Sequence, residues 1–295
     1  MSGPEVRTAL VFGGQGQLGR ALAETTGVGW RVAAVDLPEV DITSPGAAEV
    51  AIEAHQPALV INAAAYTAVD RAEQEPELAT LVNAVGAGNV AAAAAAAGSR
   101  HVHISTDFVF DGRQGHPYEP KDPPRPLNVY GTSKLDGERR VEQATAGEAL
   151  IFRTAWLYGV HGSNFVLTML RLLGSRRSVQ VVVDQVGTPT WTRSLARAIW
   201  VAAELPALRG VHHWTDAGVA SWYDFAVAIR EEALALHMLQ QAAEVLPIPT
   251  TAYPTPAQRP SFSVLSKEQT WAALGIRPDH WRANLRLMLE ELHGA

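Results

Sequence analysis

The chain has 295 residues, a formal net charge of −6 and no cysteine. That length can bury a sizeable core, as one large domain or two smaller ones. The lack of cysteine excludes disulfides and fits the cytoplasm, and the acidic balance argues against a nucleic-acid binder, which needs a basic surface. The apolar run "TALVFGG" is too short for a signal peptide, and we expect no stretch to approach the length of a membrane span.

Short apolar segments alternate with helical patterns through the first 155 residues. The pattern predicts strands at 8–14, 31–36, 58–65, 101–106 and 149–154, and helices at 16–26, 44–57, 76–97 and 128–146. Each strand is apolar on both faces and is followed by a helix, which is typical of a parallel sheet covered on both sides. The predicted fold is therefore an α/β, Rossmann-like, doubly wound parallel sheet.

After residue 155 this alternation is less regular. We expect a helix at 163–173, a strand at 178–183 and a helix at 191–204 that could still belong to the sheet layer, then a strand at "GVHHW", a helix at 221–239 and a packed proline-rich loop at 246–260. These patterns predict a nucleotide-binding domain at 1–160, to which 178–205 returns. Residues 161–295 mainly form a smaller, discontinuous C-terminal lobe.

Three glycines, Gly13, Gly16 and Gly19, separate the first predicted strand from the first helix in "FGGQGQLG". Gly13 permits a tight turn, Gly16 lets the backbone approach a pyrophosphate, and Gly19 lets the helix pack close to the strand. The helix N-terminus then favours the negative charge. The strand before the loop and the helix after it favour a dinucleotide site over a plain tight turn.

An acidic residue, Asp36, ends the second predicted strand about 20 residues after the glycine loop, where such a residue binds the adenosine ribose hydroxyls. Its charge disfavours a 2′-phosphate, so the sequence predicts NADH as readily as NADPH. Asp41 and Ile42 could contact the adenine, although Asp41 could equally cap the segment that follows.

A tyrosine and a lysine, Tyr130 and Lys134, stand four residues apart in "NVYGTSKLDGE". Residues at i and i+4 share a helix face, so both side chains can point into one cleft. A lysine ammonium stabilises a nearby phenolate, and the phenol can then protonate a carbonyl oxygen as a general acid. The alternative is a surface Tyr–Lys pair without a catalytic role.

The segment "ISTDFVFDG" leaves the C-terminal end of a predicted strand, where ligands bind in an open α/β sheet. Thr106 or Ser105 could hydrogen-bond the same substrate oxygen as Tyr130. Asp107 is a second polar candidate, or a cap for the following turn. The histidines, by contrast, lack carboxylates at ligand spacing, and we expect no metal site among them.

Several motifs in chain order resemble one family, the dTDP-4-dehydrorhamnose reductases, within the extended short-chain dehydrogenase/reductase superfamily. They are "GQGQLG", "INAAAYTAVDRAE", "STDFVFDG", "NVYGTSKLDGE", "FRTAWLYG", "NFVLTML", "DQVGTPT" and "TTAYPTPAQRP". The resemblance extends nearly from end to end. It implies reduction of the 4-keto group of dTDP-6-deoxy-L-lyxo-4-hexulose to dTDP-L-rhamnose, with NADPH or NADH.

The resemblance also assigns roles to individual residues. Tyr130 is the proton donor, Lys134 its electrostatic partner and a ribose ligand, and Thr106 the hydroxyl that steadies the alkoxide. The residues implied at the cofactor are Gly16, Gln17 and Leu18 at the pyrophosphate and Ala65, Tyr66 and Thr67 along its length. Asp107 and Trp156 lie against the sugar nucleotide. We add Arg259 as a phosphate contact because it is a cation in the C-terminal lobe, although "QRP" could equally be structural.

The sequence departs from the family pattern at three positions. Phe108 stands where relatives often have tyrosine near the sugar, which leaves the exact ketosugar open. Ala21 and Arg193 occupy positions where some members have glutamates that bind magnesium at a dimer interface. Neither residue can replace a carboxylate ligand. We therefore expect no magnesium, and a monomer or weak homodimer.

Two other functions remain open at this point. The chain could reduce another dTDP-4-ketodeoxysugar, for example on a route to dihydrostreptose or an antibiotic sugar. It could also be a non-catalytic nucleotide-binding subunit that regulates a partner enzyme, although an intact set of Thr106, Tyr130 and Lys134 argues against this. We expect a cytoplasmic protein with no membrane or nucleic-acid partner.

Overall fold

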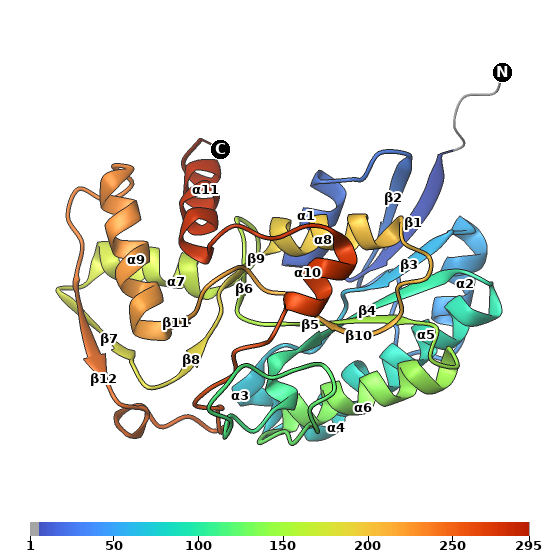
Figure 1. Cartoon of the computed structure of the whole chain (residues 1–295), viewed down its shortest axis with the longest axis horizontal. Coiled ribbons are helices and arrows are strands. Elements are labelled where there is room, and N and C mark those ends of the chain that lie inside the picture. The colour runs from blue at the N-terminus through green and yellow to red at the C-terminus, as the bar shows by residue number, and fades with distance from the viewer. Residues whose placement is uncertain (1–5, 295) are drawn as a thin grey trace.

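The computed structural model describes residues 6–294 and is built around a six-stranded sheet (Figure 1). The strands are β1 (Arg7–Phe12), β2 (Trp30–Val35), β3 (Leu59–Asn62), β4 (Arg100–Thr106), β5 (Leu150–Thr154) and β10 (Gly210–His213). They pair in parallel in the order β10-β5-β4-β3-β1-β2. The direction of winding reverses at β1, so the crevice between the ends of β1 and β3 is where such a sheet binds ligands.

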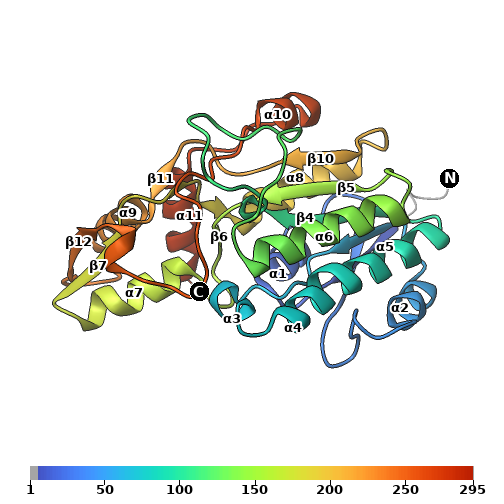
Figure 2. The same cartoon turned by 90° about the horizontal axis from the view of Figure 1, so that it is seen from below.

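Helices cover both faces of this sheet. Helices α1 (Gln17–Glu24) and α8 (Thr192–Ala203) pack on one face, and α2 (Ala47–His55), α5 (Ala87–Ala96) and α6 (Val129–Ala144) cover the other (Figure 2). Side chains of β1 alternate accordingly: Ala9 and Val11 pack towards α1 and α8, and Leu10 and Phe12 towards α2 and α5. The predicted doubly wound α/β fold is confirmed.

The alanine-rich helix predicted at 76–97 forms in three parts: α4 (Pro76–Thr80), a π-helical stretch (Leu81–Gly86) and α5. By length and composition alone, Pro76–Ala96 could cross a membrane, so the expectation that no segment reaches that length was wrong. Half of the most apolar stretch of this helix is nevertheless buried inside the fold. Its alanines pack against the sheet and α6, as in the core helix of a globular protein.

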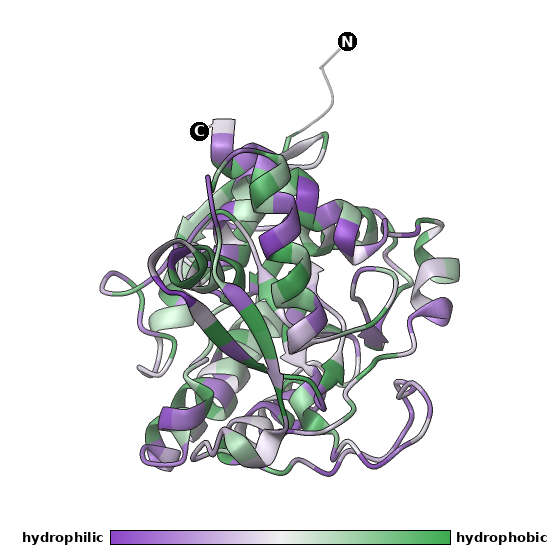
Figure 3. Cartoon of the chain, turned by 90° about the vertical axis from the view of Figure 1, so that its left-hand side faces the viewer, coloured by the Kyte–Doolittle hydropathy of each residue, from purple (hydrophilic) through white to green (hydrophobic). Residues whose placement is uncertain are grey.

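A second lobe packs beside the C-terminal ends of the strands. It contains α7 (Phe165–Ser175), β7 (Ser178–Val182), α9 (Trp222–Ala235), β12 (Glu244–Ile248) and α11 (Trp281–Gly294). Phe225, Ile229, Leu285 and Met288 are fully buried in its own apolar core. In Figure 3, hydrophobic and hydrophilic stretches alternate along these elements, which is the pattern of one buried and one exposed face.

The structure corrects the sequence on three elements. The strand expected at 178–183 in the sheet layer instead pairs with β12 in a separate two-stranded sheet, because the C-terminal segment supplies its partner. The helix expected at 44–57 begins only at Ala47, after Gly46 adopts a left-handed conformation. The first part of the proline-rich loop instead belongs to β12 and to a 3₁₀ turn at Thr250–Ala252. The residue bounds predicted for the two domains stay a prediction.

The remaining elements are short. They are α3 (Val69–Ala72), a 3₁₀ turn (Asp107–Val109), β6 (Leu157–Tyr158), β8 (Val186–Gly187), β9 (Thr190–Trp191), β11 (Ala220–Ser221) and α10 (Glu268–Leu274). Strand β6 pairs with β9, and β11 with β8. The sequence did not predict α10 or α11. Helix α10 packs beside α8 and thereby brings the chain back to the sheet layer before α11.

Candidate active site

The predicted site residues gather in one cleft of about 560 Å³ at the C-terminal ends of β1, β3, β4 and β5. Those that line it are Gly13, Gly16, Gln17, Leu18, Gly19, Ala65, Thr67, Thr106, Asp107, Phe108, Tyr130, Lys134 and Trp156. Asp36, Asp41 and Ile42 line an adjoining crevice of about 260 Å³, which shares Gly13, Gly16 and Ala65 with the cleft. A parallel sheet brings these residues together because all its strands end at the same edge.

The glycine loop is as tight as its sequence suggests. Gly13 has φ +79°, and a Cβ there would stand 2.6 Å from Ala64 N. A Cβ on Gly19 would lie 2.3 Å from the Gly13 carbonyl oxygen, so α1 packs directly onto the loop. Helix α1 begins after Gly16 without a side-chain cap, so its first amides are available to an anion. The loop therefore fits a dinucleotide pyrophosphate.

Asp36 lines the crevice that adjoins the cleft. Its Oδ2 accepts a 2.8 Å hydrogen bond from Gln15 N, and its Oδ1 accepts another of 2.8 Å from Leu37 N. Asp41 accepts from both the amide and the hydroxyl of Thr43 and so caps the following turn. It also lines the crevice, and its contact with adenine stays a prediction. Asp36 thus fixes the glycine loop and places a carboxylate at the adenosine end.

Helix α6 carries Tyr130 and Lys134 into the cleft. The Lys134 ammonium is buried and donates to the Ile104 carbonyl oxygen at 2.6 Å. Ile104 lies in β4, just after the last residue that pairs with β3. Burial lowers the pKa of Lys134 to about 8, although the nearby Glu138 carboxylate opposes this. The position of Lys134 at the strand end is fixed by a backbone carbonyl.

Burial raises the pKa of the Tyr130 phenol to about 12, against a hydrogen bond with Thr106 that lowers it. The carboxylate of Asp107 raises it further. Burial therefore outweighs the stabilisation of the phenolate that we expected from Lys134, which bonds to the backbone instead. The phenol remains protonated near neutral pH, as a proton donor must be.

Both hydroxyls at the end of β4 line the cleft, but it is Thr106 that forms a hydrogen bond with the Tyr130 phenol. Ser105 donates its hydrogen bond to the buried Glu138 carboxylate. Thr106 Oγ1 donates to Asp107 Oδ1 at 3.1 Å and accepts from Phe108 N at 3.2 Å, which caps the 3₁₀ turn. Burial raises the pKa of Asp107 to about 6. The Phe108 ring meets Tyr130 edge-on, with 5.7 Å between ring centroids.

Trp156 forms the border between the cleft and a second cavity. Its backbone is left-handed (φ +47°), and its indole stacks on Trp222 with 3.5 Å between centroids. On the other side, a Cβ at Gly187 would meet the Trp156 ring at 2.7 Å. The left-handed backbone persists because the ring is held on both sides.

The second cavity measures about 680 Å³ and shares Ser163 with the cleft. Its lining includes Asp70, Phe165, Gln185, Trp222, Tyr253 and Arg259. The predicted phosphate ligand Arg259 forms a bidentate ion pair with Asp70 of α3, at 2.9 and 2.7 Å, and donates to Thr255 Oγ1 at 2.6 Å. This pair joins the sheet domain to the C-terminal lobe and holds the pKa of Asp70 below its usual range.

Sequence reasoning assigned no role to Trp222, Gln185, Ser163 and Asp70. Asp70 and Gln185 lie inside motifs that carry the family resemblance, whereas Trp222 and Ser163 lie outside them, and all four reach the cavity from distant parts of the chain. Tyr66 was predicted at the cofactor but lines neither the cleft nor the adjoining crevice. Its phenol donates to Glu75 Oε2 at 2.7 Å. Its contact with a cofactor stays a prediction.

Ala21 and Arg193, at the positions where some family members bind magnesium, make other contacts in this structure. Arg193 donates to Glu24 at 3.2 Å and to Glu291 at 2.6 Å, so a guanidinium lies between the two carboxylates. Ala21 is buried in α1. Within residues 6–294, no group of three or more histidines and carboxylates is arranged to hold a metal ion.

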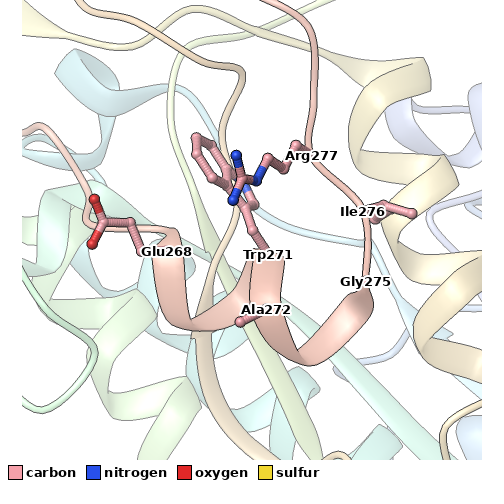
Figure 4. Close-up of a pocket in the computed structure, with 6 residues that line it drawn as sticks. All are labelled: Glu268, Trp271, Ala272, Gly275, Ile276 and Arg277. Atoms are coloured by element: carbon pink, nitrogen blue, oxygen red, sulfur yellow. The ribbon is translucent and has the colours of Figure 1, made fainter.

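A further pocket of about 650 Å³ lies at α10, apart from these residues (Figure 4). Trp271, Arg277 and Glu268 line it, and Glu268 lies at the start of the helix. None of the predicted site residues lines it. The functional assignment therefore rests on the cleft at the strand ends.

Comparisons with known proteins identify the family of the chain. The family described as "RmlD substrate binding domain" matches residues 7–293. A dTDP-4-dehydrorhamnose reductase of Burkholderia thailandensis is 42% identical, over 96% of this chain and 98% of that one. One of Streptomyces griseus is also 42% identical, over 94% and 91%. The crystal structure of the Bacillus anthracis reductase with NADP has a TM-score of 0.90 at 34% identity and covers 97% of this chain and 99% of that one. The chain thus belongs to the dTDP-4-dehydrorhamnose reductase family.

Proposed function

We propose that this protein reduces the 4-keto group of dTDP-6-deoxy-L-lyxo-4-hexulose to give dTDP-L-rhamnose, with NADPH or NADH as reductant. The observation that carries the proposal is the convergence of Thr106, Tyr130 and Lys134 in one cleft that continues into the glycine loop. Such a cleft suits hydride transfer because it joins a dinucleotide site to a proton donor.

The glycine loop and Asp36 fit a dinucleotide. Gly13, Gly16 and the uncapped start of α1 would hold the pyrophosphate, and Asp36 the adenosine ribose. Lys134 would bind the ribose beside the reacting atoms. When bound, the reduced nicotinamide supplies the hydride for the carbonyl carbon.

Tyr130 and Thr106 act on the carbonyl oxygen of the sugar. Thr106 hydrogen-bonds that oxygen and stabilises the negative charge that grows on it. Tyr130 then transfers its phenolic proton to the oxygen. A phenol whose pKa is about 12 can still do so, because a secondary alkoxide is a stronger base than a phenolate. The charged Lys134 stabilises the phenolate that remains.

The second cavity suits the nucleotide part of the substrate. It opens from the cleft at Ser163 and offers an aromatic face on Trp222 and a cation on Arg259. Arg259 is already paired with Asp70, so we expect a diphosphate to bind beside this ion pair or to displace Asp70 from it. This placement puts the sugar between Trp156 and Tyr130.

We expect the Asp36 carboxylate to favour NADH over NADPH. In an Asp36→Asn variant we expect the ratio of kcat/KM for NADPH to that for NADH to rise about five- to tenfold, because a negative charge no longer faces the 2′-phosphate. Steady-state rates with both cofactors measure the ratio. Asp136→Asn is the matched control, since Asp136 pairs with Arg139 and lines neither the crevice nor the cleft. An unchanged ratio in Asp36→Asn would show that Asp36 does not select the cofactor.

The proposed activity is tested by NADPH oxidation on addition of dTDP-6-deoxy-L-lyxo-4-hexulose, with the product identified by NMR. We expect dTDP-L-rhamnose. Phe108 removes a hydroxyl from the sugar end of the cleft, so turnover of a different dTDP-4-ketodeoxysugar in a substrate panel would instead support the second function. Cofactor binding without turnover of any ketosugar would favour a regulatory subunit.

We also propose a cytoplasmic enzyme that is a monomer or a weak homodimer. Arg193 supports the weak association, because it pairs with Glu24 and Glu291 of its own chain where some relatives bind magnesium between subunits. Sedimentation with and without magnesium tests this. A tight dimer that dissociates when magnesium is removed would contradict it.

A further inference from the structure

A buried carboxylate lies on the same face of α6 as the two catalytic residues. Tyr130, Lys134 and Glu138 follow one another at intervals of four, so their side chains line one side of the helix. Glu138 is only 3% exposed and lies one turn further from the cleft than Lys134. A buried carboxylate is costly unless it is paired, so its partners indicate why it is there.

Two strands supply those partners. Arg153 of β5 donates to both Glu138 oxygens, from Nε at 2.9 Å and from Nη2 at 2.7 Å, and Ser105 of β4 donates to the same carboxylate. Ser105 and Arg153 stand opposite each other in the β4–β5 ladder, each one residue before the strand end. Arg153 also donates to the Pro120 carbonyl at 3.2 Å. The carboxylate is therefore held rigidly.

The Glu138 carboxylate attracts the Lys134 ammonium as well as the Arg153 guanidinium. Its ammonium is 2% exposed and forms one hydrogen bond with the protein, to Ile104 O. Tyr130 and Glu138 lie on the same face of α6, and His103 on β4 is near enough to interact with the charge of Lys134. Arg153 on β5 reaches this group through its ion pair with Glu138. Burial keeps His103 uncharged, with its pKa well below the usual value. Glu138 is thus the anion that balances both Lys134 and Arg153.

We propose that Glu138 is a positioning residue for the reduction: held by Arg153 and Ser105, it keeps the Lys134 side chain in its ammonium form at the Ile104 carbonyl, one helical turn from Tyr130. The role of Glu138 in the reduction rests on the proposed function. Its effect on the charge of Lys134 does not depend on any substrate.

Two variants test the proposal because they move the charge on Lys134 in opposite directions. Glu138→Gln removes the anion and leaves Arg153, so Lys134 must lose its proton at lower pH. Arg153→Gln removes the competing cation and leaves Glu138, so Lys134 must keep its proton to higher pH. We expect shifts of about one pH unit each way. If Glu138 only held the fold together, both variants would break the same ion pair and shift Lys134 alike.

The chain has only three lysines, Lys121, Lys134 and Lys267, so ¹³C-lysine NMR can follow Lys134 directly, assigned with a Lys134→Met variant. Wild type should titrate near pH 8. Opposite shifts in the two variants support the proposal, and equal or absent shifts overturn it. Should Glu138→Gln fail to fold, Arg153→Gln decides alone: a raised titration point supports the proposal and an unchanged one overturns it.

The pH dependence of kcat/KM for the ketosugar forms the second arm. As pH rises through the pKa of Lys134 the ammonium is lost, so the rate should fall, at lower pH in Glu138→Gln and at higher pH in Arg153→Gln. A wild type that consumes no cofactor would refute the proposed function. The NMR titration would still decide the role of Glu138 independently.

Discussion

Replacing Tyr130 by phenylalanine is expected to slow ketone reduction by about 10²- to 10⁴-fold, with little change in cofactor binding or stability. The substitution removes one hydroxyl and keeps the ring, whose edge contact with Phe108 is preserved. The variant keeps Thr106 to bind the carbonyl oxygen but has no proton to give it. The loss should therefore appear in kcat rather than in the KM for the cofactor.

Steady-state kinetics and a urea titration measure the two parts of this expectation. Tyr223→Phe is a suitable control because Tyr223 packs in the C-terminal lobe, outside the cleft, and should leave the rate unchanged. If Tyr130→Phe turned over like wild type while the control behaved as expected, the enzyme class would survive but the general acid would have to be sought elsewhere. Asp107, which is buried beside Tyr130, would be the next candidate.

An alanine at Gly19 is expected to weaken NADPH binding by more than about tenfold and to lower the free energy of unfolding by about 1–3 kcal/mol. Its Cβ would stand 2.3 Å from Gly13 O and 2.6 Å from Gly14 Cα. Those atoms are backbone, so no side chain can rotate away. The loop must move away from α1, and the amides that would hold the pyrophosphate move with it.

Fluorescence titration with NADPH and urea unfolding measure both effects. Gly115→Ala is the matched control, because nothing lies within 4 Å of its Cβ position and its backbone is not left-handed. Equal cofactor affinity in the Gly19 variant and wild type would mean that the loop tolerates expansion. The close packing of α1 on the loop would then have no part in cofactor binding.

Local spacing made much of the cleft predictable. Gly13 and Gly19 are recognised because a tight turn and a close helix demand glycine, and Tyr130 and Lys134 because a helix brings i and i+4 together. Thr106 follows from the rule that parallel strands present their ends to a ligand. Each of these arguments needs only a few neighbouring residues, which a sequence displays directly.

Other features depend on partners far along the chain. The pairing of Glu138 with Arg153 requires α6 to lie over β5, and no spacing in either segment indicates it. Strand β7 looked like a strand of the main sheet because its own residues cannot tell which segment will pair with it; β12 does so about 65 residues later. The left-handed Trp156 is likewise set by Trp222 and Gly187.

The path of the chain between the lobes limits how such proteins can be recombined. The segment with α7 and β7 belongs to the C-terminal lobe, α8 and β10 return to the sheet layer, and α9, β12 and α11 leave it again, with α10 packed beside α8 between the last two. A single crossover before α7 between two related genes therefore exchanges the C-terminal lobe only together with α8, β10 and α10. It joins α8 of one parent to α1 of the other across the sheet-layer core of Leu22 and Leu195. New sugar specificities in this architecture should accumulate by point substitution around the cleft, and a designed exchange has to replace several separate segments at once.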